Sequence, residues 1–262
     1  MIIEDQFHPT LNPIWQVTQI GTGTVTTSAD EGLRLRTAPN SQGYSNAQIT
    51  DYNYPPKHFR YRPPVHMTIT ARASGAGDTL RGTAGFGFWN HPFSPDLSAL
   101  PRLPRSIWFF FASPPSDMRL MRGVPGSGWK AATIDATGAG ALALIPAALP
   151  LTLLMRRPYF YDRLWQGIQD RLGVSEHLLA PELLAAWHTY EILWGKDQVV
   201  FRIDGVTVHE TRHSPHGDAG FVAWIDNQYA VATPQGMLKF GIVPIAHEQS
   251  LLLRDLKIAM NA

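Results

Sequence analysis

The stretch 187–211, WHTYEILWGKDQVVFRIDGVTVHET, predicts the fold of this chain. Apolar and polar side chains alternate in its first run and, after a polar turn at 196–198, in a second run. Asp204 and Gly205 favour the positive φ angles of a type I′ hairpin turn, and a third run begins at Val206. Such alternation is typical of strands with one buried face. The stretch therefore predicts an antiparallel meander of three strands.

The same pattern occurs on both sides of this meander. It is clear in GLRLRT (32–37) and in PVHMTITAR (64–72), where every second residue is apolar. AGFVAWIDNQYAVAT (219–233) reads as one long strand, and LLLRDLKI (251–258) as the last one. Twenty-two glycines and 21 prolines supply the turns between such strands. The chain is therefore predicted to be an all-β protein.

Helical periodicity is confined to about 146–186. Phe160, Leu164, Ile168 and Leu172 recur every four residues, as an amphipathic helix requires. Ser175 is a suitable cap for a second helix that would run through Leu184. We expect a single domain, 1–262, whose sandwich has a first half at 1–137 and a second half at 187–262, with a mostly helical apolar insertion at about 138–186.

The segment 138–157, GAGALALIPAALPLTLLMRR, carries no charge before Arg156. It is just long enough for a bilayer, but a span here would put the two halves of one sandwich on opposite sides. Pro146 and Pro150 would also each cost about 3 kcal/mol in a helix interior. We therefore expect no transmembrane span and predict that the segment packs against the sheets. An exposed or ligand-covering element, or peripheral membrane contact through 138–157, is the alternative.

The composition excludes several classes of function. Basic and acidic residues number 22 and 21, and no basic run is interleaved with aromatics, so nucleic acid is not an expected partner. The absence of cysteine excludes disulfides, thiolate metal sites and a cysteine nucleophile. The first residues show no secretory signal, which predicts a cytoplasmic protein.

Three segments together resemble a known superfamily. FHPTLNPIWQV (7–17), GLRLRTAPNSQGYSNAQITDY (32–52) and the meander resemble the concanavalin A-like lectin/glucanase superfamily, most closely its family 16 glycoside hydrolase branch. The resemblance implies a jelly-roll β-sandwich of two curved antiparallel sheets. It also implies that a ligand lies on the concave face.

The same resemblance implies where catalytic acids would lie. Family 16 hydrolases carry Glu-x-Asp-x-x-Glu, or a close variant, on one strand of the concave sheet, and a retaining mechanism needs two carboxyls about 5–5.5 Å apart. The expected place here reads RSIWFFFASPPSD (105–117), with Trp108 and Phe110 among the residues that replace the acids. No catalytic residue of the family therefore transfers to this chain.

The aromatic replacement suggests an apolar cleft. We expect a hydrophobic or amphipathic small molecule to bind there, and the alternative is a carbohydrate-binding or hydrolase-like protein with relocated acids. The predicted ligand-binding residues are Trp89, Asn90, Trp108, Phe110, Trp224 and Gln228.

Asp226 lies within an apolar run, where burial would raise its pKa and suit it to acid/base chemistry with His91 as its partner. The structural alternative is that Asp226, Asn227 and Gln228 satisfy backbone amides of loops.

No metal or other cofactor is expected. His209, His213 and His216 are spaced like ligands, but they fall on a strand and a Pro/Gly turn, so we expect surface histidines. Some members of the superfamily hold a structural calcium ion, for which Glu4, Asp5 and Asp255 near the termini are candidates. A calcium site is not indicated, because no Asp-rich loop is present.

Overall fold

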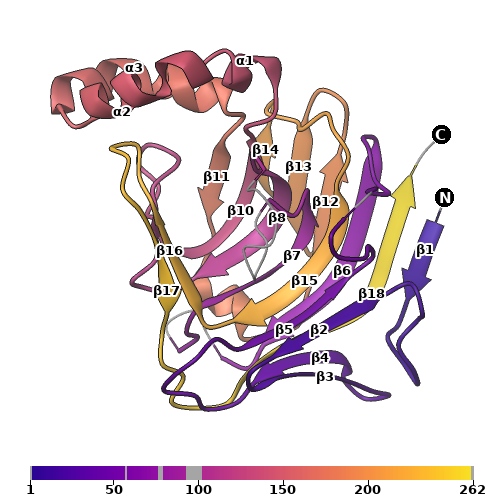
Figure 1. Cartoon of the computed structure of the whole chain (residues 1–262). Helices are drawn as coiled ribbons and strands as arrows, with labels where there is room; N and C mark the ends of the chain where they lie inside the picture. The colour runs from indigo at the N-terminus through magenta and orange to yellow at the C-terminus, as the bar shows by residue number, and fades with distance from the viewer. Residues whose placement is uncertain (1, 57, 76–78, 93–101, 261–262) are drawn as a thin grey trace.

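Two large β-sheets pack face to face, and a layer of short helices lies across one end of them (Figure 1). This computed structural model describes residues 2–56, 58–75, 79–92 and 102–260. In both large sheets every strand pair is antiparallel. The predicted all-β jelly-roll sandwich with a helical insertion is confirmed.

The eight-stranded sheet, here called the outer sheet, runs in the order β14-β13-β12-β6-β18-β4-β3, with β1 beside β18. Its turn residues Asp204 and Gly205 have φ of 51° and 78°, as predicted for the meander of β12 to β14. The strands of this sheet are β1 (Ile2–Asp5), β3 (Gly23–Ser28), β4 (Gly32–Thr37), β6 (Val65–Ala73), β12 (His188–Trp194), β13 (Val199–Ile203), β14 (Val206–Thr211) and β18 (Gln249–Met260).

The seven-stranded sheet, here called the cleft sheet, runs in the order β11-β10-β8-β7-β15-β5-β2. Its strands are β2 (Gln16–Ile20), β5 (Asn46–Thr50), β7 (Thr83–Trp89), β8 (Arg105–Ala112), β10 (Gly128–Asp135), β11 (Ser175–Leu178) and β15 (Gly220–Asp226). One face of it packs on the outer sheet, and we call the other its open face.

A small third sheet and the helices complete the fold. The sheet is formed by β9 (Asp117–Met118), β16 (Gln228–Ala232) and β17 (Leu238–Ile242), and β9 runs parallel to β16. The helices are α1 (Ala139–Leu142), α2 (Ala148–Met155) and α3 (Pro158–Arg171), with 3₁₀ turns η1 (Ile145–Ala147) and η2 (Pro181–Leu184). Figure 1 shows β16 and β17 standing away from the sandwich and rising toward the helices.

The core lies between the two large sheets. The alternating residues of β4 and β6 point into it as predicted, and Leu33, Leu35, Met67 and Ile69 are fully buried. Aromatic rings fill its centre: Phe86, Phe109 and Trp129 of the cleft sheet meet Tyr190 of the outer sheet with ring centroids 4.9–6.0 Å apart. Burial of this apolar surface is the main stabilising contribution to the fold.

The segment 219–233 is not one strand as predicted. The chain leaves the cleft sheet after Asp226, and β16 begins at Gln228 in the small sheet. Asn227 causes the break, because its side chain accepts from Ser45 N at 2.8 Å and donates to the carbonyls of Gly43 and Val243, both at 3.1 Å. These bonds satisfy three backbone groups of neighbouring loops, and strand pairing does not continue at Asn227.

The predicted helix at 175–184 is also wrong. Residues 175–178 form β11, which pairs with the free edge of β10, and only η2 is helical. The backbone bonds offered by an unpaired strand edge override the local helix signal here.

The insertion is more exposed than predicted. Within α1, η1 and α2 only Ala141 and Met155 are buried, whereas the sequence predicted packing against the sheets. The helix at α3 is confirmed, but Trp165 and Gln169 form its buried face while Leu164 is exposed. None of the helices in the described ranges is long and apolar enough to cross a membrane.

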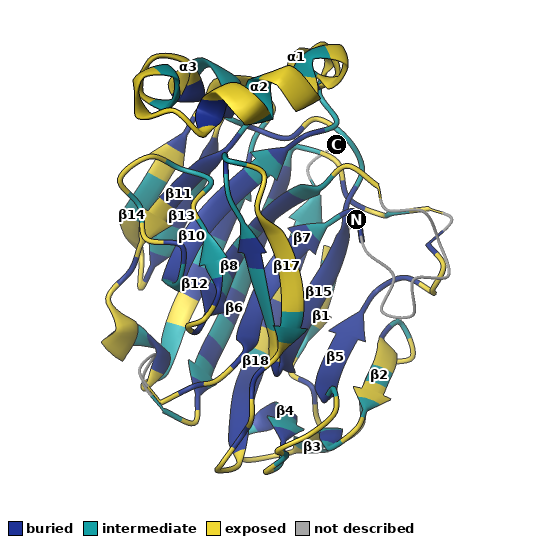
Figure 2. Ribbon diagram, turned by 60° about the vertical axis from the view of Figure 1, so that its left-hand side comes forward, coloured by how far each residue is buried: buried dark blue, intermediate teal, exposed yellow. Residues whose placement is uncertain are grey.

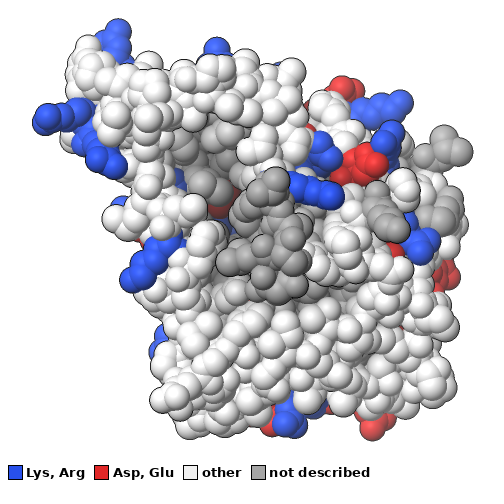
Figure 3. Space-filling model, viewed as in Figure 1, with Lys and Arg blue, Asp and Glu red and all other residues white. Residues whose placement is uncertain are grey.

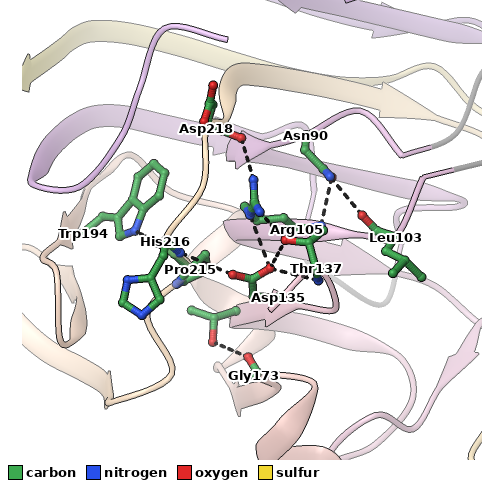
Figure 4. Close-up of polar contacts among 11 residues, drawn as sticks. Asn90, Leu103, Arg105, Asp135, Thr137, Gly173, Trp194, Pro215, His216 and Asp218 are labelled. Atoms are coloured by element: carbon green, nitrogen blue, oxygen red, sulfur yellow. Dashed lines mark hydrogen bonds and ion pairs between the residues drawn. The ribbon is translucent and has the colours of Figure 1, made fainter. Parts of the chain in front are cut away.

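A polar network fastens one end of the cleft sheet (Figure 4). The Arg105 guanidinium pairs with Asp135 at 3.3 Å, bonds Thr137 and donates to the Asp218 carbonyl at 3.2 Å. A Cβ on Gly217 would lie 1.9 Å from Arg105 Nη1, so glycine in the loop after β14 leaves room for the guanidinium. The network ties β8 and β10 to that loop.

Candidate functional site

Four aromatic side chains meet on the open face of the cleft sheet. Trp89 comes from β7, Trp108 and Phe110 from β8, and Trp224 from β15. The rings of Trp108 and Phe110 stack at 5.2 Å, those of Trp89 and Trp224 at 6.3 Å, and Trp108 lies 5.3 Å from Trp224. The structure thus brings together all four aromatic residues predicted for the site. We call them the aromatic platform.

Two glycines of β7 lie among these rings and make room for them. A Cβ on Gly85 would lie 2.9 Å from the Trp224 ring, and one on Gly87 would lie 2.7 Å from Trp108 Cβ. Glycine in a strand interior often marks such a close approach. The GFGFW pattern therefore allows aromatic side chains of neighbouring strands to lie over β7.

A row of polar side chains borders the platform on β5 and β2. Gln48 is the cross-strand neighbour of Trp224 and pairs on its other side with Thr18. Asn46 and Thr50 share this face, because residues two apart in a strand point the same way. A cleft of about 540 Å³ runs along this row and is also lined by Gln16, Tyr52, Asn53, Tyr54 and His91.

The sequence prediction missed this polar row. The alternation of Asn46, Gln48 and Thr50 with Ala47 and Ile49 in NAQIT was the available signal. Because β5 is short and buried on both sides, the pattern alone does not show that its polar face adjoins the tryptophans. The cleft is consequently half polar, and not apolar throughout as predicted.

Asp226 is buried at the end of β15 beside the start of β7. Its Oδ1 accepts from the Thr83 hydroxyl at 2.8 Å, from Thr83 N at 3.2 Å and from Gln228 N at 3.0 Å. Burial raises its pKa to about 6 despite these bonds. The carboxyl satisfies backbone amides, which is the structural role that the sequence left open as the alternative.

His91 lies at the other end of these strands, so the predicted pair with Asp226 is not formed. Asp226 is paired with Thr83 at the start of β7. Trp89, at the end of β7, is six residues after Thr83, and His91 comes just after it. At about 3.3 Å per residue the two ends are about 20 Å apart. His91 Nδ1 instead contacts the Tyr52 hydroxyl at 3.0 Å, and its ring packs 4.9 Å from that of Trp89.

The burial of His91 predicts a pH dependence of stability. Burial and the nearby Arg102 lower its pKa to about 4. The ring is therefore protonated at a lower pH in the folded protein than in the unfolded chain, where its pKa is about 6.5. Its stabilising contribution is present above pH 6.5 and is lost as the pH falls toward 4. Relative to His91→Gln, we expect wild type to lose about 3 kcal/mol of unfolding free energy between pH 7 and pH 4. Urea unfolding at several pH values measures this difference, and a constant difference would contradict the burial of a neutral ring.

The remaining predicted ligand-binding residues have other positions. Asn90 is buried, donates to the Leu103 carbonyl and accepts from Arg105 N, both at 2.9 Å, so its side chain positions the start of β8 (Figure 4). Gln228 is exposed at the start of β16 and does not share the open face with Trp224. Neither side chain belongs to the aromatic platform, because the chain turns away from the sheet before or after each of them.

A buried ion pair occupies the β10 and β11 side of the open face. Lys130 Nζ lies 3.4 Å from Glu176 Oε2, and their side chains are only 2% and 8% exposed. Burial raises the pKa of Glu176, and Lys130 partly offsets this. Glu176 is four strands from Asp226 in the sheet and lies level with Val222, four residues before Asp226. At 4.8 Å per strand and 3.3 Å per residue, the two positions are about 23 Å apart.

The candidate metal ligands have protein partners of their own. His209 Nε2 contacts Ser175 Oγ at 2.8 Å and is half-buried, unlike the surface histidine predicted, while His213 lies 3.6 Å from Asp170. Glu4 pairs with Lys257 at 2.7 Å, and Asp5 accepts from Phe7 N and from Trp15 Nε1, both at 2.6 Å. These residues do not fit a calcium site. Across the described part of the chain, no three His, Asp or Glu side chains converge as metal ligands.

Comparison with known families supports the resemblance. Residues 160–233 match the family model described as glycosyl hydrolases family 16. This range holds most of α3 and all of the meander, β15 and β16, and so includes Trp224 and Asp226. No curated protein matches the sequence.

Solved structures share the fold over nearly the whole chain. A structure from a study of endo-acting O-glycanases of human gut microbiota has a TM-score of 0.55 at 11% identity, covering 99% of both chains. A family 16 endo-glucanase from Bacteroides ovatus has a TM-score of 0.52 at 12% identity, covering 98% of this chain and 99% of that one. The Emp47p carbohydrate recognition domain has a TM-score of 0.51 at 12% identity, covering 100% of this chain and 95% of that one. The predicted resemblance to the concanavalin A-like superfamily and its family 16 branch is thus confirmed.

Proposed function

We propose that this protein binds a glycan chain on the open face of its cleft sheet. The observation that carries the proposal is the polar row beside the aromatic platform, with Gln48 next to Trp224 across one strand pair. Sugar rings have apolar C–H faces that pack on indole rings, and hydroxyls that bond to side-chain amides. An open face that offers both surfaces side by side suits such an amphipathic ligand.

A glycan explains more of the cleft than an apolar small molecule does. An apolar ligand would use Trp108 and Trp224 but would leave the amides of Asn46 and Gln48 facing hydrocarbon, which is unfavourable. The structural neighbours support the same choice, because their descriptions name O-glycanases, an endo-glucanase and a carbohydrate recognition domain. We therefore favour carbohydrate over the apolar ligand that the sequence suggested first.

The geometry favours binding over hydrolysis by a facing pair of acids. On the described open face the carboxyls are Asp226 and Glu176, about 23 Å apart, whereas glycosidases hold their pair about 5–9.5 Å apart. Trp108 and Phe110 also occupy the open face of β8, the strand where the family's acids were expected. Each of the two carboxyls is moreover held by its own protein partners.

The proposal is tested by binding to immobilised glycans. We would screen β-glucans, chitin oligosaccharides and mucin-type O-glycans with wild type and with Gln48→Ala, whose side chain adjoins the platform. Saturable binding of one class, weakened in the variant, is the expected result. Binding to none of them, together with a stoichiometric apolar molecule extracted from the native protein by organic solvent, would instead favour the apolar ligand.

Incubation with the bound glycan should release no new reducing ends. The reason is the wide separation of Asp226 and Glu176, which leaves neither with a partner acid across one glycosidic bond. A reducing-end assay over several hours measures this. Product formation by wild type that disappears in Asp226→Asn would show a hydrolase with relocated acids and contradict the expectation.

A further inference from the structure

The exposed apolar side chains are concentrated on one part of the molecule. Of seventeen large hydrophobic residues exposed in the described chain, seven lie on the helices between 139 and 171 and four lie between 237 and 242. Figure 2 shows both segments as largely exposed. Leu149 and Leu238 are each at least 70% exposed, although they are among the most apolar side chains. Such a concentration marks an interaction surface.

The two segments form one continuous surface. The tip of the β16–β17 hairpin contacts α2: Arg156 Nε donates to the Gln235 carbonyl at 3.4 Å, and a Cβ on Gly236 would lie 2.3 Å from Thr152 Cγ2. We call the apolar residues on both sides of this contact the apolar rim. It consists of Ile145, Leu149, Leu153, Leu154, Met237 and Leu238.

Cationic side chains flank the apolar rim. Arg156 and Arg157 directly follow α2 and are exposed, and Arg163 projects from α3 over the Tyr159 ring at 5.7 Å. Figure 3 shows Lys and Arg side chains at the free end of the helical layer. Exposed leucines next to arginines and an exposed tyrosine are the composition of segments that lie in the interface of an anionic bilayer.

We propose that the apolar rim docks the protein on the surface of an anionic lipid membrane. The leucines enter the acyl boundary and the arginines contact the headgroups, while the sandwich stays in water. A second copy of the chain is a poorer occupant, because a symmetric contact through this patch brings the same arginines toward each other. The surface lies outside the glycan cleft, so the proposal stands independently of the proposed function.

Vesicle co-sedimentation tests this proposal. Vesicles of phosphatidylcholine with 30% phosphatidylserine are expected to bind wild type at least tenfold more strongly than phosphatidylcholine alone. The variant Leu149→Ser/Leu153→Ser/Leu238→Ser should lose at least tenfold in binding, and Arg156→Gln/Arg157→Gln/Arg163→Gln should lose the preference for phosphatidylserine. Val206→Ser is the matched control, because Val206 is equally exposed but lies on the β13–β14 hairpin.

Two results would overturn the proposal. One is wild type that stays in the supernatant with both vesicle types. The other is a dimer in light scattering without lipid that the leucine variant converts to a monomer, which would identify the rim as a contact between copies. Since all substituted side chains are exposed, thermal unfolding should show each variant folded as wild type.

Discussion

Replacing Trp108 by alanine is expected to weaken glycan binding about 30-fold or more. Trp108 stacks on Phe110 and contacts both Trp89 and Trp224, so it is the central ring of the aromatic platform. Central aromatic anchors of binding surfaces typically contribute about 2 kcal/mol or more, which corresponds to this factor. Isothermal titration with the glycan class found in the screen measures the change.

Trp187 provides the matched control for this substitution. It lies on the outer sheet between Arg72 and Arg254, whose guanidinium carbons are 5.1 and 4.3 Å from its ring centroid. Trp187→Ala removes a tryptophan of similar exposure from the opposite side of the sandwich and should leave binding unchanged. Equal losses in the two variants would show that the cleft is not the binding site.

Gly87→Ala is expected to destabilise the fold by about 3 kcal/mol or more. Its Cβ would lie 2.4 Å from the Ile107 carbonyl oxygen and 2.6 Å from Trp108 Cα, and its φ of 147° is strained for any other residue. The atoms it meets belong to the backbone of β8, which cannot move without breaking two strand ladders. The melting temperature should fall by roughly 6 to 10 °C for a chain of this size.

Gly123 separates the two causes of this effect. It also has a positive φ, of 80°, but no atom lies within 4 Å of its potential Cβ. Gly123→Ala therefore carries only the backbone strain of about 1–2 kcal/mol. If it destabilised the protein as much as Gly87→Ala, the close approach of β7 and β8 would not be the cause.

Local alternation predicted the strands, because a strand that is buried on one face has an apolar residue at every second position of its sequence. It placed Val65, Met67, Ile69 and Ala71 on one face, and these are the buried residues of β6. Trp108 and Phe110 were predicted for a different reason: the run 107–111 is apolar throughout, and the resemblance put that strand on a ligand-bearing sheet. Together these led to the aromatic platform before its geometry was known.

The relation between distant strands could not be read from such patterns. Asp226 and His91 both follow apolar runs, but only the pairing of β7 with β15 shows that they lie at opposite ends. The row of Asn46 and Gln48 was missed for the same reason, since its importance comes from adjacency to β15. The apolar composition of 138–157 predicted burial, yet most of its large apolar side chains are exposed.

A crystal structure of the protein with the glycan that binds most tightly would test the central claim most directly. We predict a sugar ring packed on Trp108, with hydroxyls bonded to Gln48 or Asn46 in the cleft along β5 and β2. A glycan bound elsewhere, with the open face of the cleft sheet empty, would contradict the account.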